Sequence, residues 1–205
     1  MHFEEDHVYH VYNMGNHKDH LFFEDENYRF FLNKIKAYIV PVSEILAYCL
    51  MPNHFHLMIL ANKKSTETIN TRFSKEDDFK IQVLARKLGT LQSSYTQAIN
   101  KKYNWRGSLF RQKTKSRNLS DPQPCNEIHP QYAFFCFQYI HQNPLKAGLV
   151  NKLEDWPYSS FREYHYNRRN SICNIELAKE VLPVDFEHFY DQSYVMVNID
   201  GVNIF

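Results

Sequence analysis

The sequence predicts an α+β protein: a ferredoxin-like antiparallel sheet with two helices on one face, plus an added C-terminal helix that carries a tyrosine. Two observations lead to this prediction. Segments with the period of a strand and segments with the period of a helix follow one another as strand, helix, strand, strand, helix, strand. An aromatic helical segment follows the last strand, and we expect it to pack against the open face of the sheet.

Composition places the chain among globular proteins. It has 205 residues, enough for a substantial core, and 43% of them are hydrophobic. The formal net charge is +1, so any nucleic-acid contact must come from a local basic patch. No apolar run approaches 18 residues, and the acidic start Glu4-Glu5-Asp6 does not resemble a signal peptide. We therefore expect a soluble cytoplasmic protein with no membrane contact.

The four cysteines show no metal-binding or disulfide spacing. None of them forms a C-x-x-C pair, so we expect reduced thiols that serve in packing. They are Cys49, Cys125, Cys136 and Cys173.

The first half of the chain supplies three strands and a helix. Residues 7–14 are β-branched and aromatic and end at Gly15-Asn16, which predicts the first strand. Residues 24–40 have helical spacing, with acids at the start and Pro41 at the end. Residues 44–50 and 54–60 predict strands two and three, joined by a tight turn at Pro52-Asn53.

The second half predicts two long helices and a less regular tail. A polar connection, residues 62–74, leads to an amphipathic helix over residues 77–100. Residues 131–142 predict a largely buried helix that ends at Asn143-Pro144. A helix is expected near residues 175–181, and residues 195–205 are apolar enough to pack on the domain, with a hairpin turn at Asp200-Gly201. We divide the chain into a domain of residues 1–165 and an appendage of residues 166–205.

His54 and His56 are the first candidate functional pair. They alternate with apolar residues just after a turn, so both side chains should project from the same face of a strand. Two neutral imidazoles in this arrangement suit one divalent cation. The alternative is a pair of half-exposed histidines on the face of a sheet.

Residues 101–117 hold seven basic side chains and no acid. The last four alternate along an extended segment, a pitch that suits a nucleic-acid backbone, and Tyr103 and Trp105 are available to stack on bases. The alternative is a charged edge strand that resists aggregation. The basic residues are Lys101, Lys102, Arg106, Arg111, Lys113, Lys115 and Arg117.

Several short motifs together resemble the REP-associated tyrosine transposases, a branch of the HUH superfamily of single-tyrosine transposases. They occur in the order of that family over about residues 7–162. Met14 departs from the pattern, because the family often has an arginine beside the glycine. The matching pieces are Tyr9-His10-Val11 with Gly15, Met51-Pro52-Asn53-His54-Phe55-His56-Leu57, Gly107-Ser108-Leu109-Phe110, Tyr139-Ile140-His141-Gln142-Asn143-Pro144 with Ala147-Gly148-Leu149-Val150, and Trp156-Pro157 with Ser159-Ser160.

The resemblance implies an enzyme that cleaves and rejoins single-stranded DNA at hairpin-forming repeats. His54 and His56 would hold Mg²⁺ or Mn²⁺, and Tyr139 would attack a phosphate, leaving a 5′-phosphotyrosine link and a free 3′-hydroxyl. A cation on the phosphate oxygens lowers the barrier to such an attack. A phenolate is a better leaving group than an alkoxide, so the covalent step is reversible. Relatives work as monomers or homodimers, and both states stay open here.

An amide from the tyrosine helix is the candidate third ligand. In a helix, Asn143 lies about 40° from Tyr139 and on the same face, and Gln142 lies about 60° away on the other side. Either amide oxygen suits Mg²⁺ or Mn²⁺. The family has an amide at the Asn-Pro position, which favours Asn143. The alternative is that Asn143 only caps the helix before Pro144.

Three other functions compete with this one. A histidine-triad hydrolase needs a third histidine where this chain has Met58, which excludes that class. A replication initiator or relaxase shares the chemistry but usually carries further domains. A non-catalytic domain that binds single-stranded DNA or RNA would keep the basic segment, and only the retained His54, His56 and Tyr139 argue against it.

Overall fold

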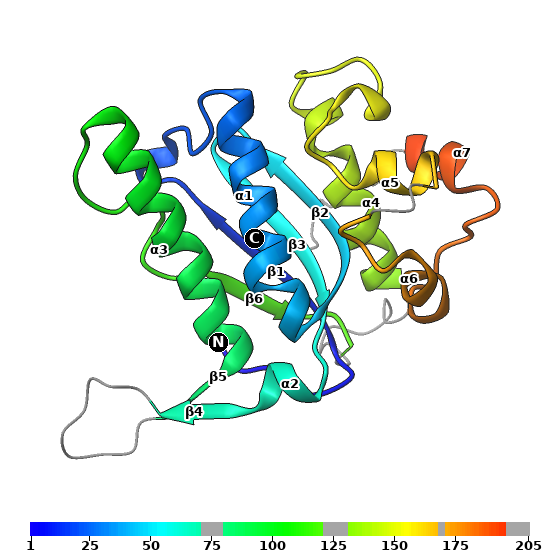
Figure 1. Ribbon diagram of the computed structural model, residues 1–205. Coiled ribbons are helices and arrows are strands. Elements are labelled where there is room, and N and C mark those ends of the chain that lie inside the picture. Colours follow the sequence, from blue (N-terminus) through cyan, green and yellow to red (C-terminus); the bar gives the residue numbers. More distant parts are fainter. Residues whose placement is uncertain (71–79, 121–130, 168–170, 196–205) are drawn as a thin grey trace.

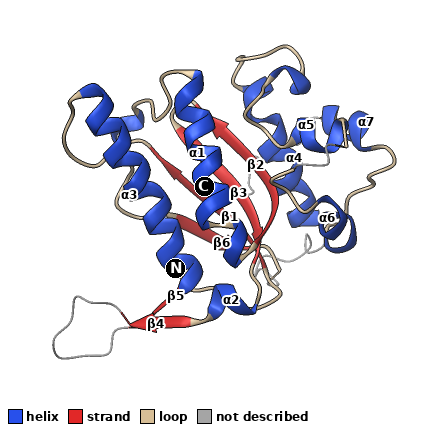
Figure 2. Cartoon of the chain, in the orientation of Figure 1, coloured by secondary structure: helices blue, strands red, loops and turns tan. Residues whose placement is uncertain are grey.

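A four-stranded antiparallel sheet forms the centre of the molecule (Figures 1 and 2). The computed structural model describes residues 1–70, 80–120, 131–167 and 171–195. The strands lie in the order β2-β3-β1-β6, which is the ferredoxin-like arrangement. The predicted fold class is confirmed. The strands are β1 (Val8–Met14), β2 (Glu44–Met51), β3 (His54–Leu60) and β6 (Lys115–Asn118).

Two helices, α1 (Asp25–Tyr38) and α3 (Val83–Tyr103), pack side by side on one face of the sheet (Figure 2). Phe31 of α1 and Tyr95 of α3 are both fully buried, and their rings meet edge to face at 5.1 Å. Phe31 also contacts Phe55 of β3. This aromatic packing, typical of apolar helix stripes on a sheet, accounts for the high aromatic content of the chain.

The segment between β3 and α3 differs from its prediction. Residues 62–74 were expected as a polar connection, but they include a short helix, α2 (Lys63–Thr66), and a strand, β4 (Thr68–Asn70). The predicted start of the next helix is also wrong in part, because β5 (Lys80–Gln82) precedes α3 and pairs with β4. Hydrogen bonding between these two short strands outweighed the helical spacing of their residues. Residues 77–79 lie outside the described part.

The tyrosine-bearing helix, α4 (Gln131–Lys146), packs on β2 and β3 from the other side of the sheet. Its predicted end at Asn143-Pro144 is wrong, because the helix continues for three residues past Asn143. It ends instead in a Schellman motif: Leu149 N donates to Pro144 O, Gly148 N donates to Leu145 O, and Gly148 has a φ of +67°. Asn143 is therefore not the residue that caps this helix.

Residues 158–160 cover the otherwise free edge of β2. Ser160 N donates to Tyr48 O, Leu50 N donates to Tyr158 O, and the Ser160 hydroxyl accepts from Tyr48 N. A short 3₁₀ turn, Leu153–Asp155, precedes residues 158–160, and the helix α5 (Phe161–His165) follows them directly. An edge capped in this way does not present free backbone groups for pairing with another chain.

The helix predicted near residues 175–181 is confirmed as α6 (Ile175–Val181), and α7 (Phe189–Tyr194) follows it. Both lie with α4 and α5 on the β2 side of the molecule (Figure 1). Phe189 packs against Phe137 and Phe161, so residues of the predicted appendage share the hydrophobic core. Residues 196–205, which carry the predicted hairpin, lie outside the described part, and the division at residue 165 stays a prediction.

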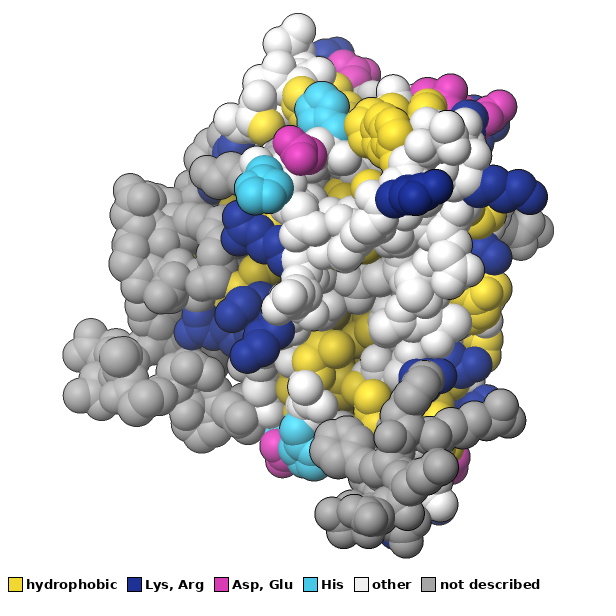
Figure 3. Space-filling model, turned by 90° about the vertical axis from the view of Figure 1, so that its left-hand side faces the viewer, with side chains coloured by type: hydrophobic (Ala, Val, Ile, Leu, Met, Phe, Trp, Pro, Cys, Tyr) yellow, Lys and Arg dark blue, Asp and Glu magenta, His cyan; other side chains and the backbone are white. Residues whose placement is uncertain are grey.

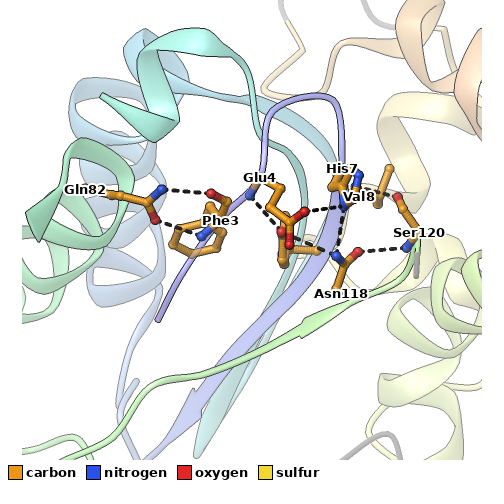
Figure 4. Close-up of polar contacts among 8 residues, drawn as sticks. Phe3, Glu4, His7, Val8, Gln82, Asn118 and Ser120 are labelled. Carbon is orange, nitrogen blue, oxygen red and sulfur yellow. Dashed lines mark hydrogen bonds and ion pairs between the residues drawn. The ribbon is translucent and has the colours of Figure 1, made fainter. Parts of the chain in front are cut away.

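The chain around the start of β1 is fixed on one side to Gln82, the last residue of β5, and on the other to the end of β6 (Figure 4). Gln82 makes two hydrogen bonds to the backbone of Phe3, at 2.7 and 2.8 Å. On the far side, Val8 N donates to the Ser120 hydroxyl, and the Asn118 amide lies 2.9 Å from His7 Nδ1. These contacts hold the start of β1 beside the end of β6.

Three of the four cysteines, Cys49, Cys136 and Cys173, are buried free thiols, as predicted, and Cys125 lies outside the described part. None of the helices within the described residues is both long and apolar enough to cross a membrane.

The burial of His141 leads to a prediction about how the free energy of unfolding changes in acid. His141 is fully buried against the Ser160 hydroxyl, and burial lowers its pKa to about 3. Its folded pKa lies below the unfolded value, so the contribution to stability is full above about pH 6.5 and is lost as the pH falls toward 3. We expect the free energy of unfolding, measured with urea, to fall between pH 6 and pH 5.

In His141→Gln that pH slope should decrease by up to about 1.4 kcal/mol per pH unit, because one fewer proton is taken up on unfolding. The control is His188→Gln: the exposed His188 has its pKa raised by its hydrogen bond to Asp185, so its loss should not reduce the acid slope. An unchanged slope in His141→Gln would contradict the assignment.

Candidate functional site

The two histidines of β3 project from the same face of the sheet, as predicted, and that face is the one covered by α4. Their rings lie 4.8 Å apart, centroid to centroid, and edge to face. Contrary to the alternative of half-exposed side chains, His56 is fully buried, although His54 is partly exposed. The pairing of β1 with β3 sets Tyr12 opposite His56 and Met14 opposite His54.

A close approach of the backbone at Gly15 fixes the turn that precedes His54. A Cβ at Gly15 would lie 2.2 Å from the carbonyl oxygen of Asp19, so no other residue fits there. Gly15 N donates to Asn53 O, and Leu21 N donates to Pro52 O. The Asn53 turn is thereby held so that its side-chain Oδ1 lies 2.6 Å from His54 Nδ1. An amide oxygen can only accept, so His54 Nδ1 carries the proton and Nε2 offers a lone pair.

His10 is a part of the site that the sequence did not predict. It is fully buried in β1, and its Nε2 lies 2.9 Å from Nδ1 of His56. The two rings stack with their centroids 5.0 Å apart. A second imidazole that engages Nδ1 of His56 orients the ring. The period-two position of His10 was visible in the sequence, but the register that brings it to His56 was not.

Burial keeps the three histidines neutral. Burial lowers the pKa of His10 to about 3, with a smaller contribution from the positive charge of Arg117. Burial lowers the pKa of His54 to about 4, and the neighbouring Asn143 amide partly opposes this. The pKa of His56 lies well below its ordinary value, through burial and then through His10 and His54. Neutral imidazoles are the form that binds metal ions.

Tyr139 lies beside these histidines. Its ring contacts His56 edge to face, with the centroids 5.5 Å apart, and Lys146 Nζ lies 5.8 Å from the tyrosine ring. Burial raises the pKa of Tyr139 to about 12, while the Asn143 side chain acts in the opposite direction. The hydroxyl is therefore fully protonated at neutral pH.

The two candidate amides of α4 point in different directions. Asn143 is 9% exposed, its Nδ2 donates to the backbone carbonyl of Tyr139, and its side chain affects the pKa of both Tyr139 and His54. Gln142 instead donates to the carbonyls of Ser193 and Val195, at 3.0 and 2.8 Å. Of the two, only Asn143 is placed on the site.

The donor set fits one divalent cation. Within the described residues, no group of three or more His, Cys, Asp or Glu side chains is placed to hold a metal. A cation here would therefore be held by His54, His56 and the amide oxygen of Asn143. The Nε2 atom of His54 is buried and makes no hydrogen bond of good geometry, although the Asn143 amide is close enough to raise the pKa of His54. A buried acceptor of this kind suits a metal ion.

The row of four cations predicted along one strand is divided between two faces. Strand β6 begins only at Lys115, where Lys115 pairs with Tyr12 and Arg117 pairs with His10 on the face of the site. Arg117 also stacks on the ring of Tyr132 at 4.4 Å. Arg111 and Lys113 precede the strand and line a groove against α3, on the other side of the sheet. The predicted single ridge is therefore wrong in its geometry.

Two of the other predicted basic residues, Lys101 and Arg106, are exposed near the end of α3. Lys102 forms ion pairs with Glu24 and Glu26, and these bonds raise its pKa. Its positive charge is therefore balanced by two carboxylates of the same chain. Trp105 is 45% exposed and stacks on Tyr103. On the face seen in Figure 3, Lys and Arg side chains lie at the left and along the right, and acidic side chains lie toward the top and bottom.

Comparison with known proteins agrees with the motifs. A Haemophilus influenzae protein described as a REP-associated tyrosine transposase is 25% identical over 128 residues, a match that covers 58% of each chain. A solved structure, a REP-associated tyrosine transposase bound to a REP hairpin, superposes with a TM-score of 0.54 at 16% identity, over 84% of this chain and 86% of that one. The resemblance to the REP-associated tyrosine transposases is confirmed. No protein-family model matches the chain. The chain matches less than two thirds of the length of the Haemophilus relative, and the structural likeness establishes the fold.

The Asn53 contact predicts the tautomer of His54. At pH 7 we expect His54 to be neutral and protonated on Nδ1, because Asn53 Oδ1 can only accept a hydrogen bond. Two-bond ¹⁵N–¹H NMR spectra, with the signal assigned through His54→Asn, report which nitrogen carries the proton. In Asn53→Ala the preference should shift toward Nε2–H, the commoner form of a free imidazole. A protonated Nε2 in the unaltered protein would contradict the geometry.

Proposed function

We propose that this protein is a transposase-like enzyme that cleaves and rejoins single-stranded DNA beside hairpin or repeat elements, through a 5′-phosphotyrosine intermediate. One observation carries the proposal: the phenol of Tyr139 is packed against His56 on the same face as His54 and Asn143. A tyrosine nucleophile beside two neutral imidazoles that could hold a divalent cation is an arrangement suited to phosphoryl transfer from DNA to the tyrosine. The relatives named above support the same class.

The chemical step exchanges one phosphate ester for another. The Tyr139 oxygen forms a bond to phosphorus, the bond from phosphorus to the 3′ oxygen of the DNA breaks, and the phenol proton ends on the released 3′-hydroxyl. No water is consumed, so the reverse reaction with a different 3′-hydroxyl joins two strands. Mg²⁺ or Mn²⁺, when bound, neutralises the phosphate oxygens during the attack.

The residues of the site do three further things. Burial keeps the pKa of His54 and of His56 below the ordinary value, so that both are neutral at pH 7 and can act as ligands. His10 and Asn53 orient the two rings through their Nδ1 atoms. Asn143 donates a hydrogen bond to the backbone carbonyl of Tyr139, and its side chain is also close enough to His54 to raise the pKa of that histidine.

A non-catalytic DNA-binding protein is the second candidate. One observation favours it: Tyr139 is only 4% exposed and its pKa is raised to about 12, so the phenol is shielded and poorly nucleophilic in this state. Catalytic geometry is often completed only in the complex, and here DNA binding would have to expose the hydroxyl.

Covalent capture distinguishes the two candidates. The protein is mixed with labelled single-stranded hairpin DNA and Mn²⁺ and then separated on a denaturing gel. We expect a covalent adduct from the unaltered protein and none from Tyr139→Phe, with hairpin affinity unchanged within about threefold, because phenylalanine keeps the packing and removes only the nucleophile. The control is Tyr132→Phe, which removes another buried hydroxyl from the same helix. An adduct with Tyr139→Phe would place the nucleophile elsewhere.

Metal binding provides a second test, which does not depend on activity. His54→Ala and His56→Ala should each weaken Mn²⁺ binding at least tenfold, as measured by calorimetry, and abolish the adduct, while DNA affinity stays within about tenfold. Asn143→Ala should weaken Mn²⁺ binding and Gln142→Ala should not, since only Asn143 is placed on the site. Equal Mn²⁺ affinity in the double histidine variant would remove the metal from the proposal.

A further inference from the structure

A groove on the far side of the sheet from Tyr139 has no role in the chemistry above. It runs between α3 and the loop of residues 107–114. Most of its lining residues carry an amide, a hydroxyl or a cation, and none of the described residues that line it is acidic. The residues that matter here are Gly89, Ser93, Gln97 and Asn100 of α3, with Arg111 and Lys113 of the loop.

The two cationic side chains of the groove are available to bind an anion. Arg111 and Lys113 are exposed, and no ion pair joins either of them to a carboxylate among the described residues. This contrasts with Lys102, which is held between two glutamates. Helix α3 does not offset this positive potential, because it contains no acidic residue from Val83 to Tyr103. An anionic partner is therefore favoured over a neutral or cationic one.

The lining also discriminates between kinds of nucleic-acid contact. Single strands are usually held by bases stacked on exposed aromatic rings. The one aromatic side chain in the lining, Phe110, is 4% exposed and packs into the core, so it offers no stacking surface. Cations with amide and hydroxyl donors are instead the groups that contact a sugar–phosphate backbone.

The groove is connected to the proposed site around one edge of the sheet. The loop that forms its outer wall leads directly into β6, an edge strand of the sheet among the described residues, where Lys115 and Arg117 face the side of Tyr139. The loop is tied to the end of β1 as well, because Arg111 N donates to Met14 O, and Met14 pairs with His54. DNA that passes around this edge can touch both faces at once.

We propose that this groove holds the sugar–phosphate backbone of the base-paired stem of a DNA hairpin, while the adjoining single strand reaches Tyr139 around the β6 edge. The inference rests on the proposed function. It assigns the stem to α3, of which only the last residues belong to the predicted basic segment. Arg111 and Lys113 would bind phosphates, and the side-chain amides of α3 would bind the sugar–phosphate backbone.

Gly89 offers a direct test, because it lies in the groove wall and a Cβ there would meet no atom within 4 Å. Gly89→Ala, Gly89→Gln and Gly89→Glu should therefore all fold, and each should melt at or above the temperature of the unaltered protein, since glycine is unfavourable inside a helix. Hairpin affinity, measured by fluorescence anisotropy, should fall in the order Ala, Gln, Glu, with at least a tenfold loss for Glu.

A matched control separates the groove from general charge. Ala37→Glu adds the same charge to an exposed position of α1, on the same face of the sheet but outside the groove, and should change hairpin affinity less than threefold. The salt dependence of hairpin binding should also become shallower in Arg111→Ala and Lys113→Ala, by about one unit of log–log slope each. Equal affinities for Gly89→Glu and Ala37→Glu would overturn the inference.

Binding to three DNA substrates shows which part of the hairpin is bound, and it distinguishes a failure of this inference from a failure of the proposed function. Gly89→Glu should lose affinity for a hairpin and for a blunt duplex of the stem, but not for an unstructured single strand. An equal loss on the single strand would overturn the assignment to the stem. If the unaltered protein forms the Tyr139 adduct while Gly89→Glu binds hairpins normally, the groove inference fails and the proposed function stands. If the unaltered protein binds no hairpin, both fail.

Discussion

The pairing of β1 with β3 is the constraint on which the candidate site depends. It places His10 within hydrogen-bonding distance of His56 and sets Met14 opposite His54, and Gly15 locks the end of the pair against the Asn53 turn. Successive side chains of a strand point to opposite faces, so a slip of one residue would turn His10 to the α1 and α3 face and leave His56 without its partner. A Cβ at position 15 would lie 2.2 Å from the carbonyl oxygen of Asp19, so a slip that brought another residue to this place would cause a clash with the backbone. The geometry of the site thus begins with a glycine that takes no part in chemistry.

Burial then sets the chemical character of the site. The same packing that orders the histidines removes water from them, lowers the pKa of His10 and His54 to about 3 and 4, and raises that of Tyr139 to about 12. The imidazoles are prepared as ligands, whereas the phenol is held in its least reactive form. These effects are opposite for the two kinds of group because burial always disfavours the charged state. A divalent cation would restore positive charge to the site, which is the change that makes a phenol easier to deprotonate.

The sequence was sufficient for the sheet and less so for what surrounds it. Residue composition, an apolar run and period-two alternation located β1, β2 and β3, respectively, to within one residue, and the tight turn at Pro52-Asn53 paired two of them correctly. Local patterns failed where pairing between distant segments decided the outcome: β5 took residues that have helical spacing, and β6 begins four residues after Arg111, so the predicted row of cations does not lie on one face. His10 was missed for the same reason, because its partner His56 lies 46 positions along the chain. The choice of Asn143 over Gln142 as third ligand came from the resemblance and stays a prediction; in the structure Gln142 donates to the carbonyls of residues 193 and 195.

The course of α4 past Pro144 explains why an asparagine is suited to position 143. A proline inside a helix removes one N–H, here the one that would donate to the carbonyl of Ile140, so the turn that follows Tyr139 has one backbone hydrogen bond fewer. Asn143 Nδ2 donates to the carbonyl of Tyr139 and adds a bond within that turn. The amide nitrogen is thereby directed at the backbone, which leaves the oxygen as the atom available toward His54. An aspartate could not make the first contact, because a carboxylate has no proton to donate to a carbonyl, and an alanine could make neither. One side chain with both a donor and an acceptor therefore steadies the backbone of the proposed nucleophile and presents an oxygen to the proposed metal site.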